Sequence, residues 1–128
     1  MFGKARAPAS SKQIGDLAEA RALSHLQDHG LVLVERNYRV ARGPSARGGE
    51  IDLVMRARDG TLVFVEVRSR SDARFGGAAA TVGVAKQRRI VFAAQSYLMR
   101  MATPPPCRFD LVTVEGSQVR WLPAAFDL

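Results

Sequence analysis

The chain has 128 residues, which is enough to bury one hydrophobic core and too few for two ordinary domains. Apolar residues make up 47% and charged residues 24% of the sequence, proportions that are typical of a globular domain and exclude a fibre or a disordered chain. The net charge is +7, and twelve lysines and arginines but only five acids lie between positions 36 and 89. This excess favours a polyanionic partner such as nucleic acid, although a solvated basic surface gives the same pattern.

We expect a single domain over residues 1–128, with a disordered tail at 1–10 and a folded core at 11–122. No apolar run approaches the length of a membrane span, and the first residues lack the apolar segment of a secretory signal. We therefore expect a cytoplasmic protein with no membrane partner. Cys107 cannot form an internal disulfide and has no histidine or cysteine neighbour at metal-ligand spacing, so we expect a buried strand residue.

The first predicted element is a helix that begins at Ser10 or Ser11, either of which can cap it, and ends at about Gly30. At 100° per residue, five apolar side chains and Glu19 fall on one arc of this helix. The apolar side chains are Ile14, Ala18, Ala22, Leu23 and Leu26. We expect this face to point at the core and to carry Glu19 with it, the alternative being an ordinary surface acid.

The rest of the chain consists of predicted strands and one further helix. In chain order these elements are a strand at 31–40, a mobile basic loop at 41–49, strands at 50–57 and 61–70, a helix at 84–101, and strands at 108–114 and 118–122. Three prolines after Thr103 must stop the second helix, because proline removes a donor and disfavours helical geometry in the residue before it. The predicted order is αβββαββ.

The two middle strands form a predicted hairpin around Asp59-Gly60, which is a strong turn signal. A strict two-residue turn would send Asp52 and Glu66 to opposite faces of the sheet. A three-residue turn at 58–60, with Gly60 in the left-handed region, instead sets Asp52 opposite Glu66. We predict this three-residue turn or an equivalent bulge.

Three acids stand at otherwise apolar positions, namely Glu19 on the first helix and Asp52 and Glu66 on the hairpin. Burying three unpaired carboxylates is costly, and a divalent cation with oxygen ligands offsets that cost. Arg68 shares a strand face with Glu66 and can reach a bound phosphate. The set indicates a Mg²⁺ or Mn²⁺ site for phosphoryl chemistry. The alternative for the two strand acids is a structural ion pair with Arg68 or Arg70 and no metal.

Six short motifs in this order resemble the YraN family. They are GDLAE at 15–19, GEIDL at 49–53, FVEVRSR at 64–70, FGGAA at 75–79, KQRR at 86–89 and RFD at 108–110. The likeness runs over nearly the whole chain, from about residue 14 to residue 122. It implies membership of the PD-(D/E)XK nuclease superfamily, close to Holliday-junction resolvases. The fold this implies is α/β, a restriction-endonuclease-like αβββαβ core with a mixed central sheet flanked by helices, and the element order derived above agrees.

Carried onto this sequence, the resemblance implies Glu19 as the helix acid, Asp52 as the central metal ligand and Glu66 as the second ligand. It puts Arg68 where the superfamily usually has lysine and makes Gln87 a further catalytic candidate. This departure matters because lysine can lose its proton and act as a base, whereas arginine stays charged and can only orient or stabilise. Activation of water would then fall to the metal.

Cations of the middle region are candidates for contact with DNA, a solvated basic face being the alternative. They are Arg42, Arg47, Arg70, Arg74, Lys86, Arg88 and Arg89. His25 and His29 have helical i, i+4 spacing but lack the glutamate of a metalloprotease motif, so we expect solvated histidines. The sequence leaves the role of Asp110 open.

The leading hypothesis is a Mg²⁺- or Mn²⁺-dependent DNA endonuclease that hydrolyses phosphodiester bonds in branched or structured DNA, because no base-reading helix or zinc module is evident. The second is a non-catalytic nucleic-acid- or partner-binding domain on a nuclease fold. The complete acid set favours the first hypothesis, and Arg68 slightly favours the second. A symmetric homodimer suits a branched duplex, and the residues leave that assembly open.

Overall fold

Two helices and five strands follow one another in the predicted order αβββαββ. They are α1 (Ser11–Asp28), β1 (Val32–Val40), β2 (Gly49–Arg56), β3 (Leu62–Ser69), α2 (Val84–Leu98), β4 (Cys107–Glu115) and β5 (Gln118–Phe126). The computed structural model describes residues 10–41, 48–69 and 82–127. Residues 1–9 of the tail predicted at 1–10, residues 42–47 of the loop predicted at 41–49 and four of the candidate DNA contacts lie outside the described residues. Those four are Arg42, Arg47, Arg70 and Arg74. Gly49, the last residue of that predicted loop, begins β2.

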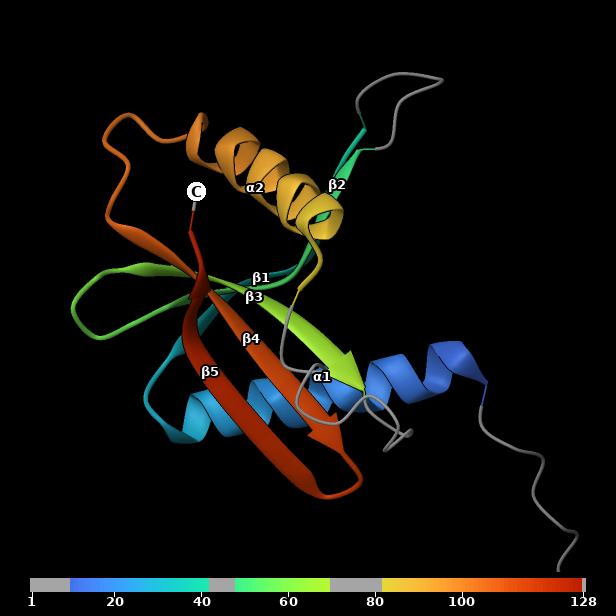
Figure 1. The fold of residues 1–128 in the computed structure, drawn as a ribbon. Coiled ribbons are helices and arrows are strands. Elements are labelled where there is room, and N and C mark those ends of the chain that lie inside the picture. The colour runs from blue at the N-terminus through green and yellow to red at the C-terminus, as the bar shows by residue number, and fades with distance from the viewer. Residues whose placement is uncertain (1–9, 42–47, 70–81, 128) are drawn as a thin grey trace, which may run out of the picture.

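The five strands form one mixed sheet in the order β1-β2-β3-β4-β5. Only β3 and β4 run parallel; the other neighbouring strands are antiparallel. A parallel pair needs a long crossover connection, and the chain segment that carries α2 provides it. Figure 1 shows α2 on one face of the sheet and α1 on the other. The α/β fold with a mixed central sheet flanked by helices is therefore confirmed.

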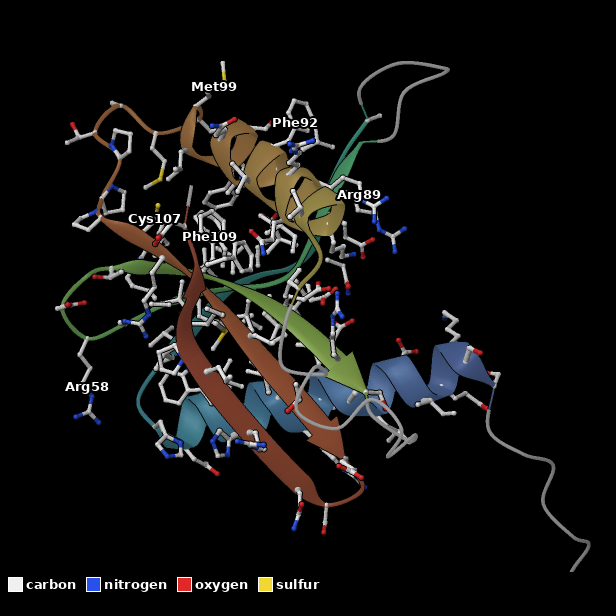
Figure 2. All side chains as sticks on the ribbon, in the orientation of Figure 1. Arg58, Arg89, Phe92, Met99, Cys107 and Phe109 are labelled. Carbon is white, nitrogen blue, oxygen red and sulfur yellow. The ribbon has the colours of Figure 1, made fainter. Side chains whose placement is uncertain are left out.

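Residues of the strands alternate between two hydrophobic layers, one under each helix. The α2 layer is Ile51, Val54, Leu62, Phe64, Val82, Ile90, Ala93, Ala94, Tyr97, Phe109, Leu111 and Phe126. The α1 layer is Ala18, Ala22, Leu26, Leu31, Leu53, Met55, Val63, Val65, Val112 and Val114. In Figure 2, Phe109 points from β4 into the α2 layer, where it stacks on Phe64 with ring centroids 5.5 Å apart. Cys107 begins β4 and is half-buried rather than buried.

The start of α1 follows its predicted cap. The Ser10 hydroxyl accepts a hydrogen bond from the Gln13 backbone N–H at 3.1 Å, and the Gln13 side chain accepts one from the Ser10 N–H at 2.8 Å. This reciprocal pair satisfies two N–H groups that the first turn leaves free. The helix ends before Gly30, whose φ of +91° suits glycine.

The predicted buried face of α1 is confirmed at Ala18, Ala22 and Leu26 and wrong at Ile14, which is 41% exposed. Figure 1 shows the reason, because the first turns of α1 extend past the strands that the rest of the helix covers. An apolar arc predicts which direction a helix faces. It does not predict how far the sheet beneath it reaches.

The second helix and the last strand end at other residues than the sequence predicted. α2 ends at Leu98, and the Met101 N–H bonds the Leu98 carbonyl in a tight turn, so Met101 lies outside the helix. β5 continues to Phe126 instead of ending at 122. It is an edge strand, where the missing N–H of Pro123 costs nothing, and the chain passes Ala124 with φ +51° before pairing again at Phe126.

Asp110, whose role the sequence left open, is a structural acid. Its carboxylate is fully buried and accepts hydrogen bonds from Trp121 Nε1 at 2.8 Å, Ala124 N at 2.9 Å and Arg108 Nε at 3.1 Å. These three bonds hold the end of β5 against β4. Both oxygens of the Asp110 carboxylate accept hydrogen bonds in this structural contact.

We expect Asp110→Ala to lower the free energy of unfolding by about 3 kcal/mol, because it leaves the partly buried Arg108 guanidinium and the N–H donors of Trp121 and Ala124 without their shared acceptor. Chemical denaturation followed by Trp121 fluorescence measures the loss. Glu115→Ala, at the exposed end of the same strand, is the control and should change stability by less than about 0.5 kcal/mol. A similarly small loss in Asp110→Ala would contradict the structural role.

Candidate active site

The hairpin of β2 and β3 has the predicted three-residue turn. The Ala57 N–H bonds the Thr61 carbonyl at 2.9 Å, and Gly60 adopts φ +91°. From there the strands pair without a shift from Arg56 with Leu62 to Leu53 with Val65. The predicted register, which brings residue 52 to the level of residue 66, is confirmed.

Beyond Leu53 and Val65 the two strands separate. Every second pair of an antiparallel ladder is hydrogen-bonded, so Ile51 and Val67 would form the next such pair. The Val67 N–H instead donates to Asp52 Oδ2 at 2.8 Å. In Figure 1 the start of β2 runs beside α2, whereas the end of β3 points toward α1. The Asp52 carboxylate therefore lies in the gap where β2 and β3 separate, which we call the fork. Strict alternation of side chains along β2 would not have predicted this position.

Glu66 is buried beside this fork, with 6% of its surface exposed. Burial, followed by the charge of Asp52 and a hydrogen bond between the two carboxyl groups, raises the pKa of Glu66 to about 8. Lys86 and Arg68 oppose that shift, with Lys86 Nζ and Arg68 Nε each 3.7 Å from Glu66 Oε2. The pair Asp52 and Glu66 is thus crowded with negative charge and held by cations from two different elements.

Glu19 reaches the same region from α1. Its side chain is 14% exposed, and Oε1 is buried with no hydrogen-bond partner among the described residues. Burial and then the charge of Asp52 raise the pKa of Glu19, while the Arg36 guanidinium, at 3.7 Å, lowers it. The prediction that Glu19 faces inward is confirmed. Arg36 is paired with this same oxygen at a distance too long for a hydrogen bond, so the buried acceptor still lacks a donor, which a closer cation or a water would supply.

The structure thus brings Asp52 next to Glu66 and within electrostatic range of Glu19. In the described part of the chain, no three histidine, cysteine, aspartate or glutamate side chains are close enough together to hold a metal ion. Gln87 donates from Nε2 to the Val82 carbonyl at 2.6 Å, a bond at the start of α2. This bond turns the Gln87 amide to the backbone rather than to the carboxylates, so its catalytic role stays a prediction.

Sequence reasoning missed Arg36 as a neighbour of the acids. Arg36 pairs with Leu53 across β1 and β2, and its guanidinium lies 3.7 Å from Glu19 Oε1. The chain between those strands runs through residues 41–48, so no short turn fixed the register in advance. Only the tertiary fold reveals this contact.

The three candidate DNA contacts on α2 have different surroundings in the structure. Lys86 reaches Glu66, as described above. Arg88 is exposed on the helix surface. Arg89 projects from α2 toward the start of β2 in Figure 2, and with Arg39 and Glu50 it lines a shallow hollow there. Arg88 and Arg89 thus lie at the surface of α2, and their contact with DNA stays a prediction.

The histidine pair lies far along α1 from these acids. The rings of His25 and His29 are 4.4 Å apart, and His29 lies 5.5 Å from the ring of Trp121. His29 is exposed and its Nδ1 hydrogen-bonds the His25 carbonyl at 2.8 Å. His25 is half-buried, so the expectation of a solvated pair is confirmed for His29 only.

No helix among the described elements is long and apolar enough to span a membrane.

Gly49 fixes how closely α2 approaches the fork. A Cβ atom at this position would lie 2.2 Å from the Arg89 carbonyl oxygen and 2.9 Å from Ala93 Cβ. We expect Gly49→Ala to push the helix from β2 and to cost about 1–3 kcal/mol, as overpacking does. Gly15→Ala is the control of opposite sign.

Gly15 lies in α1 with no described atom within 4 Å of its would-be Cβ, so alanine there should raise stability by about 1 kcal/mol. Thermal unfolding of both variants measures the difference. Equal melting temperatures for the two would contradict the close approach at Gly49.

Comparison with known sequences gives a consistent result. Residues 18–114 match the family described as Uncharacterised protein family UPF0102. A UPF0102 protein of Methylibium petroleiphilum is 65% identical over 118 residues, which are 92% of this chain and 97% of that protein. UPF0102 proteins of Albidiferax ferrireducens and Paracidovorax citrulli are 62% and 58% identical over 92% and 98% of this chain, each over 90% of its own length. The chain belongs to the UPF0102 family, also called YraN.

Proposed function

We propose that this protein is a DNA endonuclease that depends on Mg²⁺ or Mn²⁺ and hydrolyses phosphodiester bonds in branched or otherwise structured DNA. The observation that carries the proposal is the carboxylate pair in the fork, where burial of Glu66 and then the charge of neighbouring Asp52 raise the pKa of Glu66 to about 8. Two acids held this close are unfavourable for stability, and pKa values perturbed in this way gather at functional sites.

The donor chemistry of the site fits a hard divalent cation. Asp52 and Glu66 offer carboxylate oxygens, which Mg²⁺ and Mn²⁺ prefer. Glu19 adds negative charge and a buried oxygen without a hydrogen-bond partner among the described residues. We assign Asp52 and Glu66 as the ligands, and direct ligation by Glu19 remains a prediction. When bound, the metal would supply positive charge for the scissile phosphate and lower the pKa of the attacking water.

Residues of the chain itself balance the charge of the site and orient the phosphate. Arg68 and Lys86 balance the charge of Glu66 in the metal-free protein. An arginine side chain binds and orients phosphate oxygens and does not serve as a base, so we assign Arg68 the role of orienting the phosphate. In the reaction, the water oxygen bonds to phosphorus as the bond to the leaving oxygen breaks. The water proton passes to solvent, and the leaving oxygen takes a proton from solvent.

Charge supports DNA as the partner. The net charge is +7, and the excess of cations lies in the part of the chain that surrounds the carboxylates. Arg88 and Arg89 lie on the surface of α2, and Arg39 lies beside Arg89. Cations grouped next to a hydrolytic site would bind the backbone of DNA by releasing counterions. Because backbone contacts read shape, branched DNA suits them, and a homodimer would present two such sites to it.

The second candidate is a DNA-binding domain that does not cut. The same basic surface supports it, and Arg68 in place of the usual lysine is the residue that favours it. This protein would bind DNA in a salt-dependent way and leave it intact.

Cleavage of labelled linear, flapped and four-way-junction DNA separates the two candidates. The wild-type protein is assayed with Mg²⁺, with Mn²⁺ and with EDTA, beside Asp52→Ala and Glu66→Ala. We expect at least one substrate to be cut with metal and none with EDTA, and both variants to be inactive. Binding without cutting of any substrate, or equal cutting by the variants, would favour the DNA-binding domain.

A further inference from the structure

The structure of α2 itself does not explain why a lysine stands at position 86. Lys86 lies in the first turn of α2, and its ammonium is 3.7 Å from Glu66 Oε2 on β3. The side chain is 32% exposed, so the charge is partly withdrawn from water. From the sequence, Lys86 was grouped with Arg88 and Arg89 as a surface contact for DNA. The structure separates it from them.

The first turn of a helix is an unfavourable place for a positive charge, because the free N–H groups already carry partial positive charge there. α2 has no acid in its first turn and no side-chain cap on Gly83. Helix stability therefore gives no reason for lysine at this position. Its contact with Glu66, a residue of another element, is the interaction that accounts for it.

We propose that Lys86 contacts the scissile phosphate, so that α2 supplies the compact cation that β3 lacks. The proposal rests on the proposed nuclease function. With a divalent cation on Glu66, the ammonium would no longer be needed to balance that carboxylate. Its three N–H donors on a flexible stem could then turn to a non-bridging phosphate oxygen. The ammonium stabilises the charge that develops as the water oxygen bonds to phosphorus.

The test compares Lys86→Met with Lys12→Met, the same change at an exposed lysine in the first turn of α1. Three quantities are measured: the Mn²⁺ affinity by calorimetry, the Kd for DNA without metal, and the single-turnover rate of cleavage. Lys86→Met should bind Mn²⁺ at least as tightly as the wild type, because the ammonium competes with the metal for Glu66. It should cut about 100-fold more slowly. Its Kd for DNA should rise by no more than about threefold.

Lys12→Met should match the wild type in all three measurements. Lys86→Arg, which keeps the charge, should recover most of the rate that methionine loses. Wild-type rates in Lys86→Met would overturn the assignment of Lys86 and leave the nuclease proposal standing. Weaker Mn²⁺ binding together with a lower melting temperature would show a purely structural role. A wild-type protein that neither binds Mn²⁺ nor cuts would overturn both proposals.

Discussion

Asp52→Asn should cut DNA at least about 10³-fold more slowly than the wild type, a loss of about 4 kcal/mol of transition-state stabilisation. Asparagine keeps an oxygen that can accept the Val67 N–H, which Asp52 Oδ2 now accepts at 2.8 Å. The fork should therefore keep its shape while the site loses one negative ligand. Single-turnover cleavage under saturating Mg²⁺ or Mn²⁺ measures the effect, and circular dichroism checks the fold.

Asp28→Asn is the matched control, because Asp28 is exposed at the end of α1, more than two helical turns beyond Glu19. It should cut at the wild-type rate. If Asp52→Asn retained more than about a tenth of the wild-type activity, Asp52 would not be a metal ligand of the reaction.

Glu66→Gln should abolish cutting and at the same time stabilise the metal-free protein at pH 8. Glutamine keeps the shape of the buried side chain and removes the charge that burial and Asp52 disfavour. The melting temperature of the metal-free variant should exceed that of the wild type by several degrees. A variant that is more stable and inactive would show that this acid is kept for function at a cost in stability.

The same residue sets a dependence of stability on pH. The folded pKa of Glu66 is raised to about 8 from an ordinary value of 4.5, so between these values the folded protein binds a proton that the unfolded chain does not. The contribution is fully present below pH 4.5 and is lost as the pH rises through 8. Metal-free wild-type protein should therefore become more stable as the pH falls from 8 toward 5, a trend to which Glu19, whose pKa is also raised, adds.

Denaturation at several pH values between 5 and 8.5, with EDTA present, measures this slope for the wild type and for Glu66→Gln. The variant should show a distinctly shallower slope. Identical slopes in the two proteins would mean that Glu66 does not titrate in this range, and the crowded pair would no longer distinguish a functional site from a structural one.

The features that the sequence predicted correctly are those set by local chemistry. The turn at 58–60 depends on a glycine that can adopt positive φ, and this one residue fixes the register that brings Asp52 level with Glu66. The start of α1 depends on Ser10 and Gln13, three residues apart. These interactions form within a few residues of each other, so the residue types are sufficient to predict them.

The features that the sequence could not predict depend on contacts between distant segments. Lys86 was grouped with surface cations because its helix gives no sign that β3 lies against it. Arg36 was missed because the register of β1 on β2 is set by packing rather than by a short turn. The fork at Asp52 arises because α2 approaches β2 closely at Gly49, while β3 continues toward α1. No periodicity in a single strand contains that information.

The most direct test of the account is calorimetric titration of Mn²⁺ into the metal-free wild-type protein, Asp52→Asn and Glu66→Gln at pH 8. The account predicts that the wild type binds Mn²⁺ and releases protons as it does so, because the site holds a proton that a metal would displace. It also predicts that both variants bind Mn²⁺ at least about tenfold more weakly. No binding by the wild type, or equal binding by all three proteins, would contradict the assignment of Asp52 and Glu66 as a metal site.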